Sequence, residues 1–155
     1  HGAMIDRIAV QDTYPDDFSH CFGCGRHNES GYHLKTYREG DAARTDYTPA
    51  DYHTGGGDLA YGGIIASVID CHSAGAAAIF WMEANGIEVG ATYSPRFVTA
   101  RLEVDYVAPT PIGHLQLTGR VEEIGTRKVI VNTELSAAGS VTARGRAVMV
   151  KLPSG

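Results

Sequence analysis

The segment from Tyr61 to Asp70 holds the residue types in this chain that are best placed to do chemistry. Gly62 and Gly63 open an apolar run, and glycines at the start of a helix leave backbone N–H groups accessible where the helix dipole favours negative charge. Asp70 lies among Ile and Ala residues, where a carboxylate is costly to bury unless it is paired or functional. The pattern indicates an oxyanion-binding turn and a general base or nucleophile.

The spacing of these groups bears on the number of chains in the site. Gly63 and Asp70 are seven residues apart, which is roughly 10 Å along one helix, so they cannot share one carbonyl group. If two such helices pack antiparallel about a two-fold axis, Asp70 of one chain meets the Gly62 and Gly63 amides of the other. The spacing predicts a homo-oligomer if both groups act together. A purely structural explanation stays open, since glycine pairs commonly begin helices and a buried Asp can cap a neighbouring backbone group.

A Cys-x-x-Cys pair, Cys21 and Cys24, lies near the start of the chain. It is half of a zinc site, and the sequence has no second pair of this kind and no spaced pair of histidines. Completion would need one of the histidines nearby, which are His20, His27 and His33. We favour a packed structural turn, and we expect no metal and no other cofactor.

Four other residues could have a chemical role, or only a role in packing or on the surface. Cys71 is expected to be a small core residue rather than a nucleophile. His72 fits either a core histidine or a proton shuttle. Arg127 and Lys128 could meet phosphate groups, since both side chains suit phosphate recognition, but solvated surface charge is the favoured interpretation.

The composition limits the class of protein. The chain has 155 residues, 43% of them hydrophobic, and a formal net charge of −5, which is ordinary for one folded domain. It has no cluster of Lys and Arg, which argues against sequence-independent binding of nucleic acid. The apolar run at 64–82 is interrupted by Asp70 and other polar residues, so a buried helix is favoured over a membrane span. Three cysteines cannot form a closed disulfide framework, so we expect reduced thiols. No charged-then-apolar signal segment follows Met4, so we expect a cytoplasmic protein, and we expect no membrane partner.

The chain is predicted to form one domain over residues 21–155, after an irregular lead-in over residues 1–20. His1-Gly2-Ala3, before Met4, is typical of a tag remnant. Short strands at 33–37 and 43–47 should pair as a hairpin around Gly40. The glycine run at 55–57 should break regular structure and form a flexible loop.

A helix is predicted from Gly63 to about Met82, because the run is apolar on every side and about twenty residues long, with Asn85-Gly86 as its stop. Period-two patterns at 101–106, 115–121, 129–135 and 141–150 then predict a four-stranded antiparallel meander. One long helix and a sheet define an α+β fold, in which wrapping the sheet around the helix would bury the helix.

Several motifs in this order resemble the PaaI-like hotdog thioesterases over roughly residues 21–150. They are Cys21-Phe22-Gly23-Cys24-Gly25, Asn28, Gly31, Leu34, His53, Tyr61-Gly62-Gly63, Asp70 and Tyr106-Val107-Ala108-Pro109. The resemblance implies a hotdog fold, hydrolysis of an acyl-CoA, and a site shared between subunits of a dimer or a dimer of dimers.

The resemblance also assigns roles to residues. It implies that Asp70 is the catalytic carboxylate and that the backbone amide of Gly62 or Gly63 polarises the carbonyl. It also places Thr99 at the strand position where relatives can have a hydroxyl that orients water. The turn residues His53 and Gly55 are expected to bind substrate with Tyr61, and Arg127 and Lys128 are the candidates for the phosphates of CoA.

Two departures from the family pattern affect the expected activity. Tyr61 stands where the family usually has His, and Thr54 stands where Gln is common. Tyr61 can still donate a hydrogen bond but is no base near neutral pH. The alternative to an enzyme is therefore a non-catalytic module on the same fold that binds an acyl group or an acyl-CoA.

Overall fold

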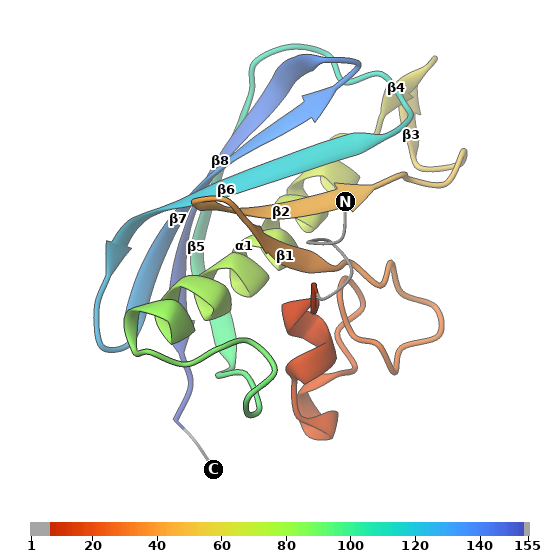
Figure 1. The fold of residues 1–155 in the computed structure, drawn as a ribbon. Helices are drawn as coiled ribbons and strands as arrows, with labels where there is room; N and C mark the ends of the chain where they lie inside the picture. Colours follow the sequence, from red (N-terminus) through yellow and green to blue (C-terminus); the bar gives the residue numbers. More distant parts are fainter. Residues whose placement is uncertain (1–6, 154–155) are drawn as a thin grey trace.

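One long helix lies across one face of an antiparallel sheet in the computed structural model, which describes residues 7–153 (Figure 1). This helix, α1, spans Gly62–Ala84, and most of its residues are buried. By length and composition it could cross a membrane, but core helices pass the same test. Because α1 is apolar on all sides, other parts of the protein must bury every side of it. The predicted tag remnant His1-Gly2-Ala3 lies outside the described residues.

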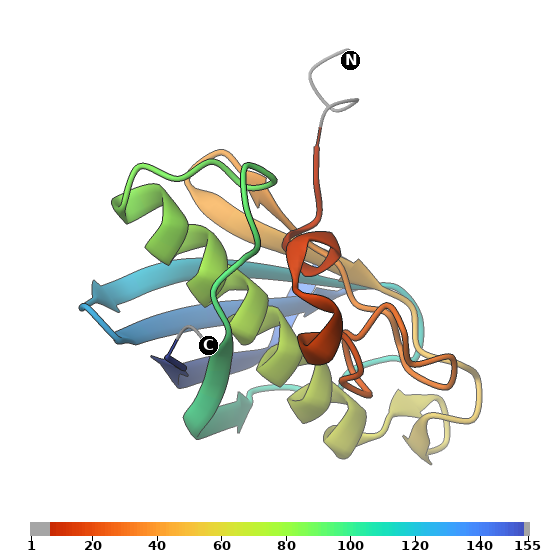
Figure 2. The same cartoon turned by 90° about the horizontal axis from the view of Figure 1, so that it is seen from below.

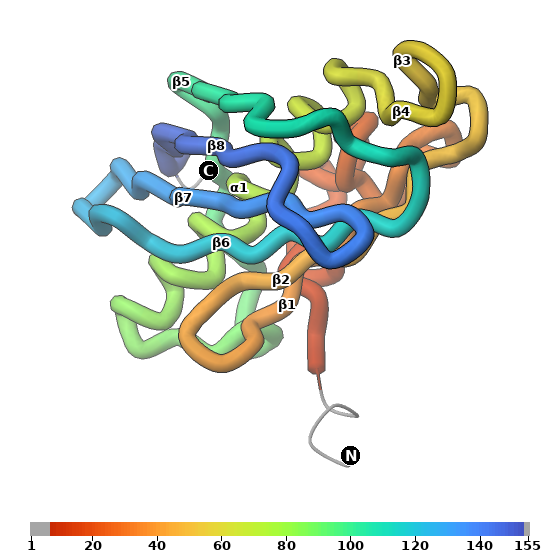
Figure 3. Tube along the Cα trace, turned by 90° about the horizontal axis from the view of Figure 1, so that it is seen from above, coloured from red at the N-terminus to blue at the C-terminus, as the bar shows by residue number. Residues whose placement is uncertain are grey.

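Six strands form the large sheet in the order β1-β2-β6-β7-β8-β5, and every neighbouring pair is antiparallel (Figure 3). The strands are β1 (Thr36–Glu39), β2 (Ala42–Tyr47), β5 (Phe97–Tyr106), β6 (Leu115–Ile124), β7 (Lys128–Ala137) and β8 (Ser140–Lys151). The sheet curves around α1, so the predicted α+β fold with a sheet wrapped on one helix is confirmed.

The predicted hairpin around Gly40 is present. Glu39 pairs with Ala42, which leaves Gly40 and Asp41 as a two-residue turn. Gly40 has a φ of 61°, a left-handed conformation that glycine adopts without steric cost. The sequence signal was sufficient here because the turn residues and the two strands are adjacent in the chain.

The prediction of a simple four-stranded meander is wrong, because β5 does not lie beside β6. Its partner is β8, in a register that runs from Phe97 opposite Lys151 to Tyr106 opposite Ala143. The other edge of β6 is occupied by β2, so the connection over residues 107–114 must cross the sheet. This leaves β5 as an edge strand with one free side.

The glycine run also differs from expectation. Thr54–Gly56 (β3) and Leu59–Ala60 (β4) form a small antiparallel pair where a loop without regular structure was predicted. Gly57 lies in the turn with a φ of 58°, so the glycines permit a tight hairpin. This hairpin leads directly into the start of α1.

The segment before β1 contains two short 3-10 helices, η2 (Val10–Thr13) and η3 (Asp16–Phe18). Val10 and Tyr14 are buried in the same hydrophobic core as α1. The side chain of Gln11 bridges to β1, since its Nε2 donates to Thr36 Oγ1 at 2.8 Å and its Oε1 accepts from the Thr36 N–H at 2.7 Å. In Figure 2 this segment lies alongside the helix and covers part of it.

Candidate active site

Asp70 lies on α1 beside the edge strand β5. Its side chain is half-buried, and Thr99 Oγ1 donates a hydrogen bond to its Oδ1 at 2.5 Å. A β-bulge at Ala100, where the pairing of β5 with β8 slips by one residue, directly follows Thr99. Bulges re-aim nearby side chains, which accounts for a threonine that reaches from an edge strand to the helix. The structure therefore brings together two of the predicted site residues, Asp70 and Thr99.

Gly62 and Gly63 form the first residues of α1. Tyr61 is the N-cap, and its side chain makes no capping hydrogen bond. The N–H groups of the two glycines have no carbonyl one turn before them, so they are free donors at the positive end of the helix dipole. Tyr106, at the end of β5, donates from its hydroxyl to the Gly62 carbonyl at 2.7 Å. β5 thus contacts the helix at both Thr99 and Tyr106.

The turn before the helix holds the other predicted substrate-binding residues. The His53 carbonyl accepts from the Tyr61 N–H at 2.9 Å, while His53 Nδ1 accepts from the Ala50 N–H at 3.1 Å. A Cβ atom at Gly55 would lie 3.4 Å from the Tyr61 Cα, so β3 passes close to the helix start. The Tyr61 side chain is 56% exposed, and its ring lies over Gly63. His53, Gly55 and Tyr61 therefore gather at one place with the two glycines.

Arg127 and Lys128 are at the other end of the helix. Arg127 lies in the turn between β6 and β7, and Lys128 is the first residue of β7. In the same turn, Trp81 Nε1 donates to the carbonyl of Thr126 at 3.1 Å. Both side chains are exposed, and Lys128 Nζ lies 3.3 Å from a carboxylate oxygen of Glu123. Within one chain, the structure does not bring these two basic residues to the glycine pair.

A hollow of about 480 Å³ is also found at this far end. Trp81 and Met82 from the helix, with Tyr93, Pro95 and Arg96 from the segment before β5, form part of its lining. The space is therefore set by how the end of α1 packs on the approach to β5, and it lies away from Asp70.

His72 points away from Asp70, toward the centre of the sheet. It is fully buried, and its Nδ1 lies 2.7 Å from Thr45 Oγ1 on β2. Burial lowers the pKa of this imidazole to about 3, because a charged ring would lose its hydration. A neutral histidine held inside the sheet fits the core role rather than a proton shuttle.

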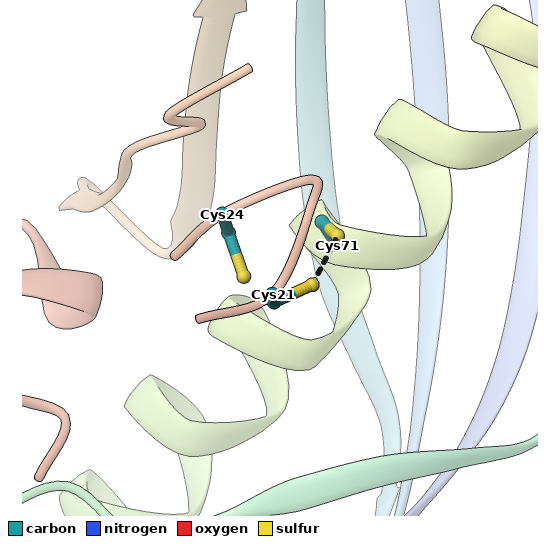
Figure 4. A group of neighbouring side chains, drawn as sticks. All are labelled: Cys21, Cys24 and Cys71. Atoms are coloured by element: carbon teal, nitrogen blue, oxygen red, sulfur yellow. Dashed lines mark hydrogen bonds between the residues drawn. The ribbon is translucent and has the colours of Figure 1, made fainter. Parts of the chain in front are cut away.

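The three cysteines lie together, which the sequence alone did not indicate. Cys21, Cys24 and Cys71 are free thiols whose sulfur atoms lie within 4.8 Å of one another (Figure 4). Hydrogen bonds from the two other thiols and from the N–H groups of Cys24 and Gly23 lower the pKa of the Cys21 thiol. Hydrogen bonding to Cys21 raises the pKa of Cys24, and also that of Cys71.

Comparison with known families identifies the class of protein. A family model for the thioesterase superfamily matches residues 57–144, more than half of the chain. A thioesterase superfamily protein from Shewanella loihica PV-4 is 38% identical, with 90% of this chain and 100% of that chain covered and a TM-score of 0.68. The chain belongs to the thioesterase superfamily, and its architecture is the hotdog fold.

More distant structures share the fold alone. The PaaI protein of the phenylacetic acid degradation operon of E. coli is 16% identical, with 79% of this chain and 82% of that chain covered and a TM-score of 0.63. A mutant thioesterase from Pseudomonas aeruginosa is 13% identical, with 79% and 84% covered and a TM-score of 0.64. Comparison with curated protein sequences gives no significant match.

Sequence reasoning missed two features near the site. The contact of Tyr106 with Gly62 joins residues 44 apart in the chain, and only the Tyr-x-x-Pro motif drew attention to that tyrosine. Cys71 lies 50 residues after Cys21, and a single cysteine in an apolar helix carries no sign of a distant partner. Both contacts depend on how the segments around α1 pack against it.

Proposed function

We propose that this chain hydrolyses an acyl-CoA thioester to the free acid and CoA, with Asp70 as the acting carboxylate. The observation that carries the proposal is the surroundings of Asp70. Among residues 7–153 its carboxylate has one hydrogen-bond donor, Thr99, and no cation within ion-pair distance. A half-buried carboxylate on an apolar helix costs stability when no cation offsets it, and such costs are tolerated where the group does chemistry.

The chemistry requires two functions. The thioester carbonyl oxygen would accept hydrogen bonds from the N–H groups of Gly62 and Gly63, where negative charge develops as the carbonyl carbon is attacked. Asp70 would take a proton from water; the water oxygen then bonds to that carbon, the C–S bond breaks, and the departing CoA thiolate receives the proton. Direct attack by Asp70, giving an anhydride that water then opens, is the second route.

A shared site between two chains follows from the spacing. Gly63 and Asp70 stay roughly 10 Å apart along one rigid helix, so one chain alone cannot bring both to one thioester. The free edge of β5 is a template for pairing with a second β5. Thr99 and Tyr106 are symmetric about the midpoint between Leu102 and Glu103, so a two-fold axis there would bring Thr99 and its Asp70 next to the partner's Tyr106 and glycine pair.

Exposed apolar side chains at this edge support the pairing. Val98, Tyr106 and Val107 are 40%, 52% and 49% exposed, and Tyr61 beside them is 56% exposed. Burial of this surface between two copies would add a favourable hydrophobic term to the hydrogen bonds of the paired strands. The proposed assembly is therefore a homodimer, or a dimer of such dimers.

The role of Asp70 is tested by Asp70→Asn, which keeps the shape of the side chain and removes its charge. We expect kcat to fall by about 10²–10⁴-fold on an acyl-CoA panel of short, long and aromatic acyl groups. Asp41→Asn, in the exposed turn between β1 and β2, is the control and should keep full activity. Wild-type turnover by Asp70→Asn, in protein with unchanged oligomeric state, would rule out the assignment.

The shared site is tested by mixing two inactive variants. Asp70→Asn lacks the carboxylate, and Gly63→Val places a side chain at the helix start, where a Cβ atom would lie 2.4 Å from the Tyr61 ring. After equal mixing and subunit exchange, half of the dimers are mixed and each has one intact site, so activity should recover to about a quarter of the wild-type value. No recovery would place both groups of the site in one chain.

The second candidate function is a non-catalytic binding module, which Tyr61 at the helix start favours. It predicts acyl-CoA binding by calorimetry without turnover, and a gain of hydrolysis on Tyr61→His. Robust hydrolysis by the wild-type protein would exclude it.

A further inference from the structure

We propose that Cys21, Cys24 and Cys71 form a binding site for a thiophilic divalent cation, with Zn²⁺ as the ion that fits the donor set. Thiolate sulfur is the protein ligand that such ions prefer. The three sulfur atoms lie within 4.8 Å of one another, two of them on one short loop and the third on α1. Figure 4 shows the Cys21 sulfur directed at the Cys71 sulfur on the helix, with Cys24 on the same loop as Cys21.

The spacing of the sulfur atoms suits a shared ion. Cys21 Sγ and Cys71 Sγ are 3.8 Å apart. Two sulfurs bound to one tetrahedral zinc ion at about 2.3 Å are themselves about 3.8 Å apart. A disulfide would need about 2.05 Å. The loop and the helix are therefore already separated by the distance that a bridging ion requires.

Residues Cys21 to Gly25 form a tight turn that holds two potential metal ligands, Cys21 and Cys24, close together. The Gly25 N–H donates to the Cys21 carbonyl at 2.8 Å, which closes the turn around the two cysteines. A Cβ atom at Gly25 would lie 2.4 Å from the Cys21 backbone nitrogen, so only glycine closes this turn. The turn therefore holds the Cys21 and Cys24 side chains together on one short loop.

Gly23 brings the turn against the helix. A Cβ atom at this position would lie 2.2 Å from Cys71 Sγ, closer than any side chain can approach. The loop is therefore in direct contact with Cys71, and the Leu34 N–H holds it there by donating to the Gly23 carbonyl at 3.0 Å. The third ligand is set by the same packing that forms the core.

The fourth position of a tetrahedral ion would be open to solvent. Within the described part of the chain, no His, Asp or Glu ligand atom joins the three sulfurs. Two of the nearby histidines have other partners, since His27 Nε2 lies 3.0 Å from Asp16 Oδ1 and His33 Nε2 contacts the Asn28 carbonyl. Cys21 is exposed, so water or a small anion can complete the coordination there.

A bound ion would connect the segment before β1 to the middle of α1, at the residue after Asp70. Coordination replaces the thiol protons, so binding should release up to three protons per ion and tighten as the pH rises. Because the fold brings the three thiols together, the ion should bind the folded chain more tightly than the unfolded chain and so stabilise the fold. The inference does not depend on the proposed hydrolysis.

The test uses the full chain, purified in reducing, metal-free buffer. We expect one Zn²⁺ per chain by elemental analysis after incubation with the ion, and a thiolate-to-metal charge-transfer band when Co²⁺ is used instead. Zn²⁺ should protect all three thiols from alkylation, read by mass spectrometry, and raise Tm by several degrees. This last set of measurements needs no variant and so does not depend on a variant's folding.

Variants define the ligand set. Cys21→Ser, Cys24→Ser and Cys71→Ser should each weaken Zn²⁺ binding by at least about 100-fold, while His20→Asn and His33→Asn should bind as the wild type does. Unchanged affinity in Cys71→Ser would overturn the three-sulfur site. Failure to bind Zn²⁺ and Co²⁺, or a mass two units low from a disulfide in protein kept under reducing conditions, would overturn it as well.

Discussion

Asp70 and His72 are two residues apart on α1 and lie in opposite surroundings. His72 faces the central strands, is fully buried, and has its pKa lowered to about 3 by that burial. Asp70 faces the edge strand β5, is half-buried, and has one hydroxyl, from Thr99, as its partner. The same helix thus carries a fully buried ionisable side chain, His72, on one face and a solvent-accessible one, Asp70, on another.

The part of the sheet that an ionisable side chain of the helix faces therefore decides what that group can do. The centre of the sheet supplies cover on all sides, so a group there is held neutral and serves packing. An edge strand covers a group from one side only, so its other side can face substrate or a second chain. We expect variants at the centre to affect stability and variants at the edge to affect turnover.

Truncation of His72 should have the largest effect on stability and tests the structural role of the sheet centre. His72→Ala removes a buried ring and leaves Thr45 Oγ1 without its 2.7 Å contact to Nδ1, so we expect the free energy of unfolding to fall by about 2–4 kcal/mol. Urea unfolding measures this loss. The kcat of the protein that remains folded should be unchanged, because the ring is fully buried and points away from Asp70.

A matched control is Val68→Ala, another fully buried position of α1 that carries no ionisable group. It should also lose stability and keep kcat. A large fall in kcat for His72→Ala alone, with stability intact, would make His72 a proton shuttle and remove the distinction between the two faces.

Adding one methyl group under His72 is a smaller disturbance of the same centre. A Cβ atom at Gly119 on β6 would lie 2.6 Å from His72 Nε2 and 3.3 Å from Val131 Cγ1. Gly119→Ala should therefore cost about 1–3 kcal/mol of stability through overpacking, read by urea unfolding. Gly56→Ala, where an added Cβ meets no atom within 4 Å, is the control and should change stability by less than about 0.5 kcal/mol. Equal stability of the two variants would show that the core around His72 can accept an added methyl group, which would contradict the prediction.

The sequence predicted local features of this fold better than distant ones. The helix was found because its apolar run is long and continuous, and the β1–β2 hairpin because Gly40 lies between its strands. The place of β5 beside β8 was missed, since a period-two pattern gives a strand's faces but not its neighbours. Residues such as Asp70 and Gly62 were found by motif, whereas the contacts of Thr99 and Tyr106 that hold them, and the meeting of Cys71 with Cys21, join segments far apart in the chain.

Removal of the Thr99 hydroxyl should have the smallest effect of these changes, and it tests the role of the edge strand β5. Thr99→Val keeps the shape of the side chain but loses the 2.5 Å hydrogen bond to Asp70 Oδ1. Since this single hydrogen bond is exposed to solvent, we expect a modest effect on the transition state, a fall in kcat of about tenfold. Stability should change by less than about 0.5 kcal/mol, because Thr99 lies on an exposed edge.

The positioning role of Thr99 is distinguished from a structural one by the form of the kinetic change. A hydroxyl that only orients Asp70 should alter kcat and leave KM near its wild-type value, and Thr99→Ser should restore most of the rate because it returns the donor. If Thr99→Val instead lowered stability and left kcat unchanged, Thr99 on the edge strand would have a structural role, as His72 has at the centre of the sheet. Asp70 would then be a structural carboxylate that β5 holds in place, and the open face of the helix would have no role in turnover.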